Sequence, residues 1–278
     1  MTFSKLVMYI LLLNGFGGCT SRYYEQYKSE SMKRIPSLSD TTVVTENDIA
    51  HLPLLVQRYL HFTGAVGKPR IHNFRLRVEG EMKRKIGGDW MTISAQQYEF
   101  FTDMSRLFYI KSSLYGIPFD GFHRYVGDHA TMQITVASLV QIVDAKGDTM
   151  DHSETVTLFN DMCLLAPSTL IDSTIRWVQI DSSIVKAIFT NRKQTVSALL
   201  TFDPSGKLIN FSSQDRYLSE DGKSYHNYVW STPIYEYKIF SGWNIVSTAE
   251  AVWQMPEGVF TYARFRIVEL EYNCRTFK

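Results

Sequence analysis

The chain has 278 residues, 45% of them hydrophobic and 21% charged, with only 16 Gly and 8 Pro, which excludes the disordered and collagen-like classes. The 29 Lys and Arg residues nearly balance the 28 Asp and Glu residues. Nucleic-acid-binding proteins normally carry a basic excess or a basic stripe, so nucleic acid is not an expected partner. Aromatic residues make up 14% of the chain and favour the half-buried surfaces of β-sheets.

The N-terminal stretch has the pattern of an export signal. Lys5 precedes an apolar run over residues 6–13, and small residues follow it. A charged start, a short apolar region and a small-residue exit are typical of a secretory signal. The run is too short to span a bilayer, which takes about 20 apolar residues. We therefore predict a signal peptide over residues 1–18.

The end of this stretch resembles a bacterial lipobox, in which a Leu and two small residues precede a Cys. Here Gly17 and Gly18 precede Cys19, and Phe16 stands in place of the Leu. The resemblance implies that Cys19 is acylated and anchors the chain to a membrane of the cell envelope, facing the periplasm or the exterior. The alternative is an ordinary signal peptide with an incidental cysteine.

Two helical segments are predicted after a polar stretch. Residues 19–45 are rich in polar side chains and are predicted to be the lipid anchor and a tether. A capping pattern at Thr45 begins the first helix, Pro53 begins the second, and Gly64 ends it. Residues 46–278 are predicted to form a single β-rich domain.

Polar and apolar residues then alternate, which is the pattern of strands with one buried face. About a dozen strands follow one another in hairpins, interrupted by a helix over residues 153–166. An array of this kind must hide its apolar face, so we predict a mainly β fold: a large antiparallel curled sheet, an unclosed barrel, with an N-terminal helix and a central helix insertion. A sheet of this size encloses space that a helix plug or a ligand fills. The predicted strands lie at residues 74–83, 90–101, 107–112, 123–126, 131–137, 175–180, 184–190, 195–202, 207–213, 224–237, 243–253 and 259–272.

The sequence contains no motif of a known hydrolase, nucleotide-binding protein or zinc enzyme, so no catalytic residue, cofactor or metal is predicted. His123, Asp128 and His129 are the nearest approach to a ligand cluster. Cys163 and Cys274 either pair, which export permits, or are buried free thiols.

Several polar residues lie at strand ends or inside apolar strands, where both functional groups and ordinary turn residues occur. Glu250 and Glu269 lie inside apolar strands: facing inward they would need a partner such as Arg264 or Arg266, and facing outward they would have no special role. Glu269 shares strand parity with apolar neighbours and is therefore a candidate for a polar interior group. The polar candidates are Asp161, Asp172, Asp215, Arg216 and Glu250.

Most of the chain, from about Leu52 to Asn273, resembles a family of uncharacterised bacterial proteins without an assigned activity. The order of elements is also similar to that of the periplasmic lipoprotein carriers and acceptors of the LolA/LolB type, which implies a curled sheet that holds acyl chains in an apolar cavity. The runs that carry the family resemblance are Leu52-Pro53, Val56-Gln57-Arg58-Tyr59-Leu60, Phe159-Asn160-Asp161-Met162-Cys163-Leu164-Leu165-Ala166-Pro167, Leu170-Ile171-Asp172, Ser213-Gln214-Asp215-Arg216-Tyr217, Trp230-Ser231-Thr232-Pro233, Glu250-Ala251-Val252-Trp253 and Glu271-Tyr272-Asn273.

Three functions compete at this point. The first is an envelope lipoprotein that binds an acyl chain or another apolar ligand in the cavity of the curled sheet. The second is an envelope enzyme that uses carboxylates at strand ends. The third is a structural or assembly lipoprotein, which an exposed apolar patch would support and whose protein partners the sequence does not name. The residues predicted to line the cavity are Trp90, Trp177, Phe189, Trp230 and Trp253.

Overall fold

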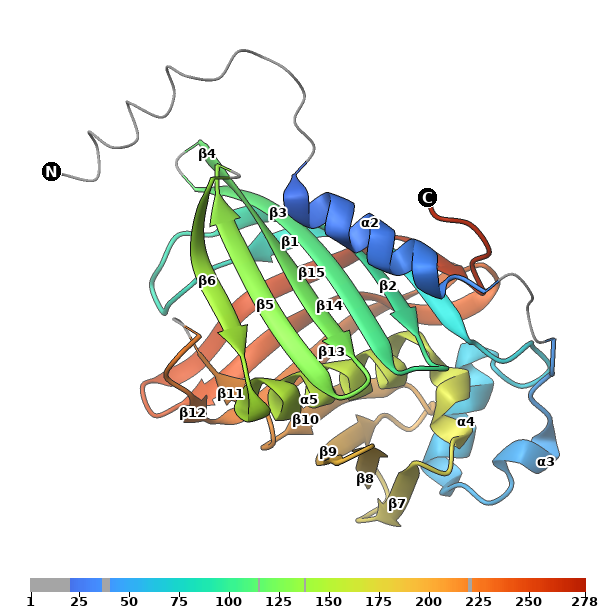
Figure 1. Ribbon diagram of the computed structural model, residues 1–278. Helices are drawn as coiled ribbons and strands as arrows, with labels where there is room; N and C mark the ends of the chain where they lie inside the picture. Colours follow the sequence, from blue (N-terminus) through green and yellow to red (C-terminus); the bar gives the residue numbers. More distant parts are fainter. Residues whose placement is uncertain (1–20, 37–40, 115, 138, 220–221) are drawn as a thin grey trace, which may run out of the picture.

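A computed structural model of the chain describes residues 21–36, 41–114, 116–137, 139–219 and 222–278 (Figure 1). The predicted signal peptide and the predicted acylation of Cys19 lie outside these residues. Among the described helices, none is long and apolar enough to cross a bilayer.

Thirteen antiparallel strands form one curled sheet, in the order β6-β5-β4-β3-β2-β1-β15-β14-β13-β10-β9-β8-β7. β6 and β7 are its free edges, so the sheet does not close into a barrel, and the predicted fold class is confirmed. A separate two-stranded sheet pairs β11 (Tyr217–Leu218) with β12 (His226–Asn227). The strands of the large sheet are β1 (Asn73–Met82), β2 (Met91–Phe100), β3 (Ser105–Leu114), β4 (Ile117–Val126), β5 (His129–Val136), β6 (Val140–Lys146), β7 (Ile175–Gln179), β8 (Ile184–Asn191), β9 (Gln194–Phe202), β10 (Leu208–Ser213), β13 (Val229–Phe240), β14 (Trp243–Met255) and β15 (Gly258–Tyr272).

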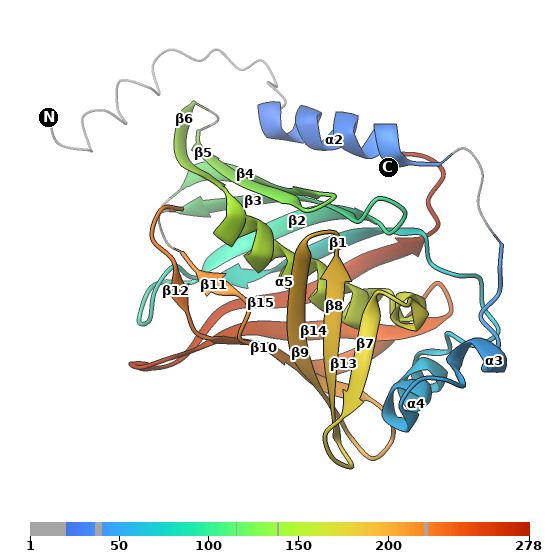
Figure 2. The same cartoon turned by 60° about the horizontal axis from the view of Figure 1, so that its bottom comes forward.

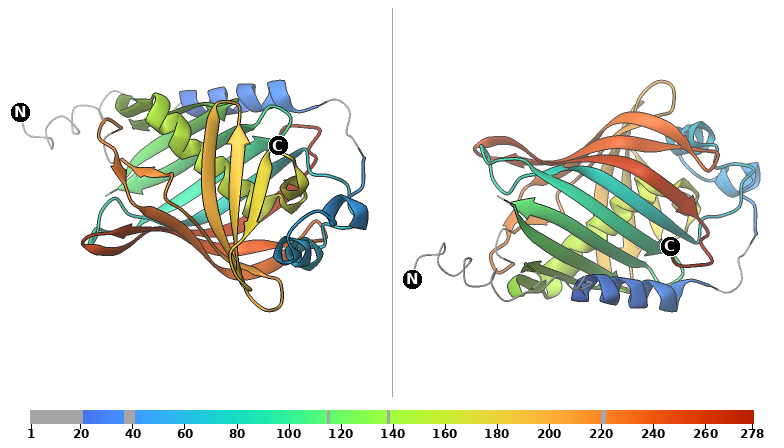
Figure 3. Two further views of the ribbon diagram at one scale, coloured as in Figure 1. Left: turned by 90° about the horizontal axis from the view of Figure 1, so that it is seen from below. Right: turned by 90° about the horizontal axis from the view of Figure 1, so that it is seen from above.

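The central helix insertion connects the two free edges of the sheet. The chain leaves β6, forms α5 (Asp148–Leu165) and the short 3-10 helix η1 (Pro167–Ile171), and then enters β7. α5 therefore crosses the open side of the curl and lies along its concave face (Figures 2 and 3). The predicted helix is confirmed, but it begins five residues earlier than Ser153. Gly147, with a φ of 108°, stands at the N-cap and makes no side-chain cap, so the usual sequence signal for a helix start is missing.

Strand alternation sorts side chains between the concave and convex faces of the sheet. In β1, Phe74, Leu76 and Val78 join the core on the concave face. In β15, however, a register shift opposite Arg77 and Val78 interrupts the alternation. Glu269 therefore pairs with Arg77, contacts it at 2.8 Å and is partly exposed, so the candidate position of Glu269 in the interior, inferred from parity, is wrong.

The convex face is covered by α2 (Arg22–Arg34), which formed part of the segment expected to be a tether (Figure 1). Tyr23, Tyr27 and Ser31 are spaced four residues apart, so they form one stripe of the helix, and all three are buried. The two tyrosines pack on aromatic residues of β2, β3 and β4. Ser21 caps the helix by accepting a hydrogen bond from the Tyr23 N–H at 3.2 Å.

The two helices predicted before β1 are both present, as α3 (Glu46–Ile49) and α4 (Leu54–Thr63). Thr45 and Asp48 form the predicted capping box, and Gly64 ends α4 in the left-handed conformation. The Tyr59 hydroxyl of α4 donates to the Cys163 carbonyl at 2.8 Å. α4 therefore fixes the C-terminal end of α5 against the sheet.

Candidate functional site

The space enclosed by the sheet is occupied by α5, one of the two occupants expected from the sequence. Aromatic residues of the sheet pack on the C-terminal half of the helix. Phe159 stacks on Phe189 of β8 with ring centroids 5.0 Å apart, and it meets Phe211 of β10 edge-on at 5.8 Å. Phe211 in turn contacts Trp230 of β13, which lies 6.5 Å from Trp253 of β14. The side of the helix that carries Phe159 is therefore held by apolar contacts.

Charged side chains hold α5 to the other half of the sheet. The Arg106 Nε of β3 donates to the Asp161 carboxylate at 2.7 Å, and its Nη1 lies 3.8 Å from the Glu154 carboxylate. Arg106 and Glu154 are both buried, and the two carboxylates lie on α5. Together with Glu99 of β2 and Arg216 of the segment after β10, these residues form what we call the interior ionic cluster.

Arg216 occupies the centre of a polar and aromatic cage. Its guanidinium donates to the Thr157 hydroxyl at 3.0 Å and to the Tyr262 hydroxyl at 3.1 Å, and it lies 3.5 Å from Glu154. The same group lies 4.5 Å from the ring centroid of Trp230, within the range of a cation–π interaction. Arg216 therefore connects the charge of α5 to the aromatic lining of the sheet.

The surroundings of the cluster shift the pKa values of two of its carboxyl groups in opposite directions. Burial raises the pKa of Glu99 well above its ordinary value, and the neighbouring Asp161 raises it further. Burial alone would also raise the pKa of Glu154, but the charges around it, Arg216 first among them, lower it below its ordinary value. We therefore expect Glu99 to be neutral and Glu154 ionised.

Glu99 is tied to Asp161 through one amide. The Gln97 Nε2 donates to Glu99 Oε2 at 3.1 Å and to Asp161 Oδ2 at 2.9 Å. Glu99 Oε1 has no hydrogen-bond partner. A carboxyl group with a raised pKa and one unused oxygen thus lies beside Asp161, which suits Glu99 to hold a proton.

His123 of β4 also lies on the concave side near Glu154. Burial lowers the pKa of His123 to about 4, although the Glu154 charge acts in the opposite direction. Its ring meets Phe108 edge-on with centroids 5.9 Å apart. The imidazole is therefore neutral at physiological pH and adds no charge to the interior ionic cluster.

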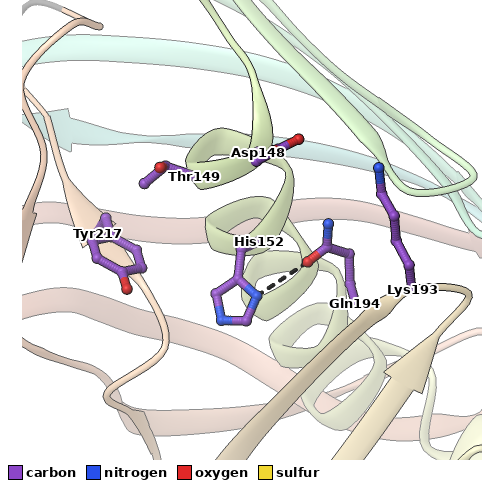
Figure 4. A pocket seen from close by; sticks show the side chains of 6 residues that line it. All are labelled: Asp148, Thr149, His152, Lys193, Gln194 and Tyr217. Atoms are coloured by element: carbon purple, nitrogen blue, oxygen red, sulfur yellow. Dashed lines mark hydrogen bonds between the residues drawn. The ribbon is translucent and has the colours of Figure 1, made fainter.

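The N-terminal end of α5 reaches the surface beside a hollow of about 470 Å³ (Figure 4). His152 Nδ1 lies 3.1 Å from Gln194 Oε1, which links the helix to the β8–β9 turn. On the other side, the Asp151 carboxylate accepts a hydrogen bond from the Ala130 N–H at 2.6 Å. Polar contacts thus hold this end of α5 in place. The hollow is lined by Asp148, Thr149, His152, Lys193, Gln194 and Tyr217.

Four of the five residues predicted to line a cavity belong to the concave side. Trp230, Trp253 and Phe189 are buried in its core, and Trp177 is partly buried against it. Trp90 precedes β2 instead, where Arg264 lies 4.4 Å from its ring centroid and Lys83 4.6 Å.

The structure brings together only two of the five polar candidates, Asp161 and Arg216. The Asp215 carboxylate accepts from the backbone N–H of Ser197 at 2.6 Å, which is a structural role. Asp172 is exposed and accepts from the Thr174 N–H.

Glu250 lies elsewhere in the sheet and pairs with Arg264 at 3.0 Å, one of the two partners considered for an inward-facing acid. Arg264 is its direct neighbour in the register of β14 and β15. The three other candidates are therefore dispersed around the fold.

Sequence reasoning missed Glu99, Arg106 and Glu154. A signal was present for Glu99, because it shares strand parity with the buried Ile93 and Ala95. Arg106 and Glu154 carry no comparable signal, since a charged residue at a strand start or in the first turns of a helix is ordinarily exposed.

The sequence left open whether the chain binds a metal ion and whether Cys163 and Cys274 pair, and the described residues form neither a metal site nor a disulfide. No three His, Cys, Asp or Glu side chains come together there as a possible metal site. Cys163 and Cys274 are both buried free thiols. Cys163 belongs to the core of the concave face and Cys274 to the cluster under α2. The two lie on opposite faces of the sheet, which settles the alternatives in favour of free thiols.

Comparison with known proteins identifies the family of the chain. Residues 42–265 match a family described as "Family of unknown function (DUF6544)", and the chain belongs to this family. The predicted resemblance to a family without assigned activity is thus confirmed. No curated protein matches the sequence.

Three solved structures are similar in fold. A DUF1329 family protein from Desulfovibrio piger is 10% identical with a TM-score of 0.46, and the match covers 85% of this chain and 96% of that one. A putative outer membrane lipoprotein-sorting protein domain from Vibrio parahaemolyticus is 9% identical with a TM-score of 0.43, covering 74% and 87%. A LolA superfamily protein from Nitrosomonas europaea is 9% identical with a TM-score of 0.43, covering 81% and 96%.

Proposed function

We propose that this member of the DUF6544 family is an envelope lipoprotein that binds an acyl chain, or another apolar ligand, on the concave face of its curled sheet, in the space that α5 occupies. The observation that carries the proposal is the double character of α5. One side of α5 packs through Phe159 on the apolar, aromatic wall of β8 and β10, whereas Glu154 and Asp161 make polar contacts with Arg106 and Arg216. Such a helix can act as a built-in occupant that a ligand replaces.

The polar contacts of α5 are of a kind that water can replace. The Tyr125 and Thr155 hydroxyls lie 2.8 Å apart, and the Asn160 amide donates to the Thr232 hydroxyl at 3.2 Å. A buried polar or ionic contact contributes little net stability relative to a well-packed apolar one, because both partners regain hydration when they separate. The apolar contacts around Phe159 have no such replacement in water. They require an apolar substitute, which an acyl chain provides.

The interior ionic cluster indicates which end group the ligand carries. α5 presents the carboxylates of Glu154 and Asp161 to Arg106 and Arg216 of the surrounding sheet and loop. If α5 moves out, the two guanidinium groups lose their partners at the end of an apolar wall. Arginine binds carboxylates and phosphates with directed hydrogen bonds. We therefore infer a ligand with an apolar chain and an anionic head, whose head takes the position of the α5 carboxylates.

The start of α5 suits a movement of this kind. Gly147 joins β6 to α5 with a φ of 108°, a conformation that residues with a side chain rarely adopt. A Cβ at this position would have no heavy atom within 4 Å, so the joint is not packed against neighbours. Rotation at Gly147 would change the direction of α5 without a clash at the joint itself.

The proposal is tested by native mass spectrometry of the protein purified from its envelope, followed by titration with a fluorescent fatty acid. We expect a co-purifying lipid and saturable binding. Comparison of a fatty acid with the fatty alcohol of equal chain length tests the anionic head. The acid should bind more tightly, and the double substitution Arg106→Gln and Arg216→Gln should remove that preference. The absence of both co-purified lipid and fatty-acid binding would overturn the proposal.

The structure bears differently on the two alternative functions, an envelope enzyme and a structural or assembly lipoprotein. An enzyme that uses the predicted carboxylates needs them around a shared cleft, but Asp172, Asp215 and Glu250 lie apart from Asp161 and Arg216. A structural or assembly role requires an exposed apolar patch, and the sheet does carry one at one end.

A further inference from the structure

Four turns lie together at one end of the large sheet, which we call the turn end. They join β1 to β2, β3 to β4, β5 to β6, and β14 to β15. The strand registers place them at the same end, because Met82 pairs with Met91, Val136 with Val140, and Met255 with Gly258. Figures 1 and 3 show the corresponding ends of these strands along one rim of the curl.

Apolar side chains are exposed along this rim. Loops at a protein surface are ordinarily polar, and a group of exposed large apolar residues marks an interaction site. Each of the five exposes between 46% and 64% of its surface. They are Ile86, Leu139, Val140, Ile142 and Val259.

The rim also carries a short basic run. Lys83, Arg84 and Lys85 occupy consecutive positions in the β1–β2 turn, which has Asp89 as its acidic residue. The turn therefore has a net charge of +2, three cations against one acid. Glu257 in the β14–β15 turn reduces the positive charge of the rim without reversing it. Apolar groups next to Lys and Arg are the composition of surfaces that bind anionic lipid membranes.

The described chain begins close to the same end. Ser21 donates a hydrogen bond to the Asp120 carboxylate, which also accepts from the Thr135 hydroxyl at 2.9 Å. Asp120 lies three residues after the start of β4, and Thr135 one residue before the end of β5. Cys19, the predicted acylation site, is two residues before Ser21, so the chain between them spans at most about 7 Å. An anchor at Cys19 would therefore hold this end, and not the opposite one, against the membrane.

We propose that the turn end is a membrane-docking face, whose apolar turns enter the interface of a bilayer rich in anionic phospholipid while the basic β1–β2 turn binds the headgroups. The bilayer is favoured over a protein partner because Ile86, Leu139 and Val259 come from three separate hairpins, all at the end of the sheet next to the predicted anchor. The docking face is independent of whether α5 moves or a ligand binds. It fixes the orientation of the domain on its membrane.

The test uses the full chain, purified in detergent and reconstituted into vesicles of phosphatidylglycerol and phosphatidylethanolamine. Single substitutions Ile86→Cys and Leu139→Cys carry an environment-sensitive fluorophore. The matched control is Ile239→Cys, which is at least as exposed, at 68%, but lies at the opposite end of the sheet, next to the β13–β14 turn. The unsubstituted chain reports any labelling of Cys19, since Cys163 and Cys274 are buried.

We expect blue-shifted emission and quenching by nitroxide-labelled lipid for the fluorophores at 86 and 139, and solvent-like emission at 239. Replacing Lys83, Arg84 and Lys85 by Gln, or omitting phosphatidylglycerol, should lower the quenching at 139 several-fold. Solvent-like emission at 86 and 139, equal to that at 239, would overturn the proposal. Shielding of these two positions only when they cross-link to another protein would also overturn it, and would assign the turn end to a protein partner.

Discussion

The two faces of the sheet each carry one helix, and the helices are buried in different ways. α2 lies on the convex face through a single buried stripe that contains Tyr23 and Tyr27, and its other side chains are partly or fully exposed. α5 on the concave face is buried on nearly all sides, with apolar and charged residues alike. A helix with one apolar stripe is an ordinary surface element. A helix that brings carboxylates into an aromatic interior points to a functional reason for their burial, since burying charge costs free energy.

The largest expected effect comes from removing one buried ring on each face. Phe159→Ala on α5 and Phe122→Ala under α2 each empty a buried site and should lower the free energy of unfolding by about 3–5 kcal/mol. Denaturant titration measures this loss. The two variants should separate in ligand binding: Phe159→Ala weakens the docking of α5 and should raise the affinity for a fluorescent fatty acid, whereas Phe122→Ala should leave it unchanged. Equal affinities in the two variants would contradict competition between α5 and the ligand.

The second largest effect is expected from the ion pairs, whose loss should change the stability by different amounts on the two faces. Arg106→Ala removes the ion-pair partner of Asp161 and one of the two arginines beside the buried Glu154, and should cost about 3 kcal/mol of stability. Arg124 on the convex face pairs with Glu30 of α2 at 3.3 Å in a partly exposed position, so Arg124→Ala should cost only about 0–1 kcal/mol. Thermal unfolding of both variants provides the comparison. A similar loss in both would mean that the interior ionic cluster is more hydrated than its burial indicates.

A smaller effect depends on pH. The folded pKa of Glu99 is raised above its ordinary value of 4.5, so the folded state retains a proton that the unfolded chain loses. Stability should therefore fall as the pH rises from about 4.5 towards the folded pKa, with a slope of up to about 1.4 kcal/mol per pH unit. Glu99→Gln should flatten this slope, as seen in urea titrations at pH 5, 6, 7 and 8. Glu154 gives the opposite pH dependence. Its pKa is lowered in the folded state, so it contributes stability that is lost only as the pH falls into the acidic range. An unchanged slope in Glu99→Gln would show that Glu99 is ionised in the folded protein.

The smallest effect concerns the attachment of α2. Ser21→Ala removes the N-cap of this helix and its hydrogen bond to Asp120, and should cost about 1 kcal/mol. Hydrogen exchange should rise in the first turn of α2 and stay unchanged in α5. Increased exchange in α5 would indicate that the two faces are coupled through the sheet.

The sequence predicts the architecture well because strand alternation and capping are local signals. Phe74, Leu76 and Val78 alternate with charged residues, and Thr45, Pro53 and Gly64 set the ends of two helices, so β1, α3 and α4 are all found as expected. The failures have a non-local cause. The orientation of Glu269 depends on a bulge that only strand pairing reveals.

α2 was missed because its stripe consists of tyrosines in an otherwise polar segment, and its burial depends on the aromatic surface of β2–β4. The interior ionic cluster was found only in part for a related reason. Arg216 was a candidate as a polar residue at a strand end and Asp161 as one of the carboxylates of a possible enzyme, but Arg106 and Glu154 meet only after the sheet has curled around α5. Pairings between residues so distant in sequence leave no pattern in a single chain.

The most direct test of the account is hydrogen exchange of α5 in the presence of ligand. With a saturating fatty acid, the amides of Asp148–Leu165 should exchange faster, because the ligand takes the place of the helix, while those of α2 keep their rates. Binding of the fatty acid with unchanged or slower exchange in α5 would contradict the claim that helix and ligand compete for the concave face.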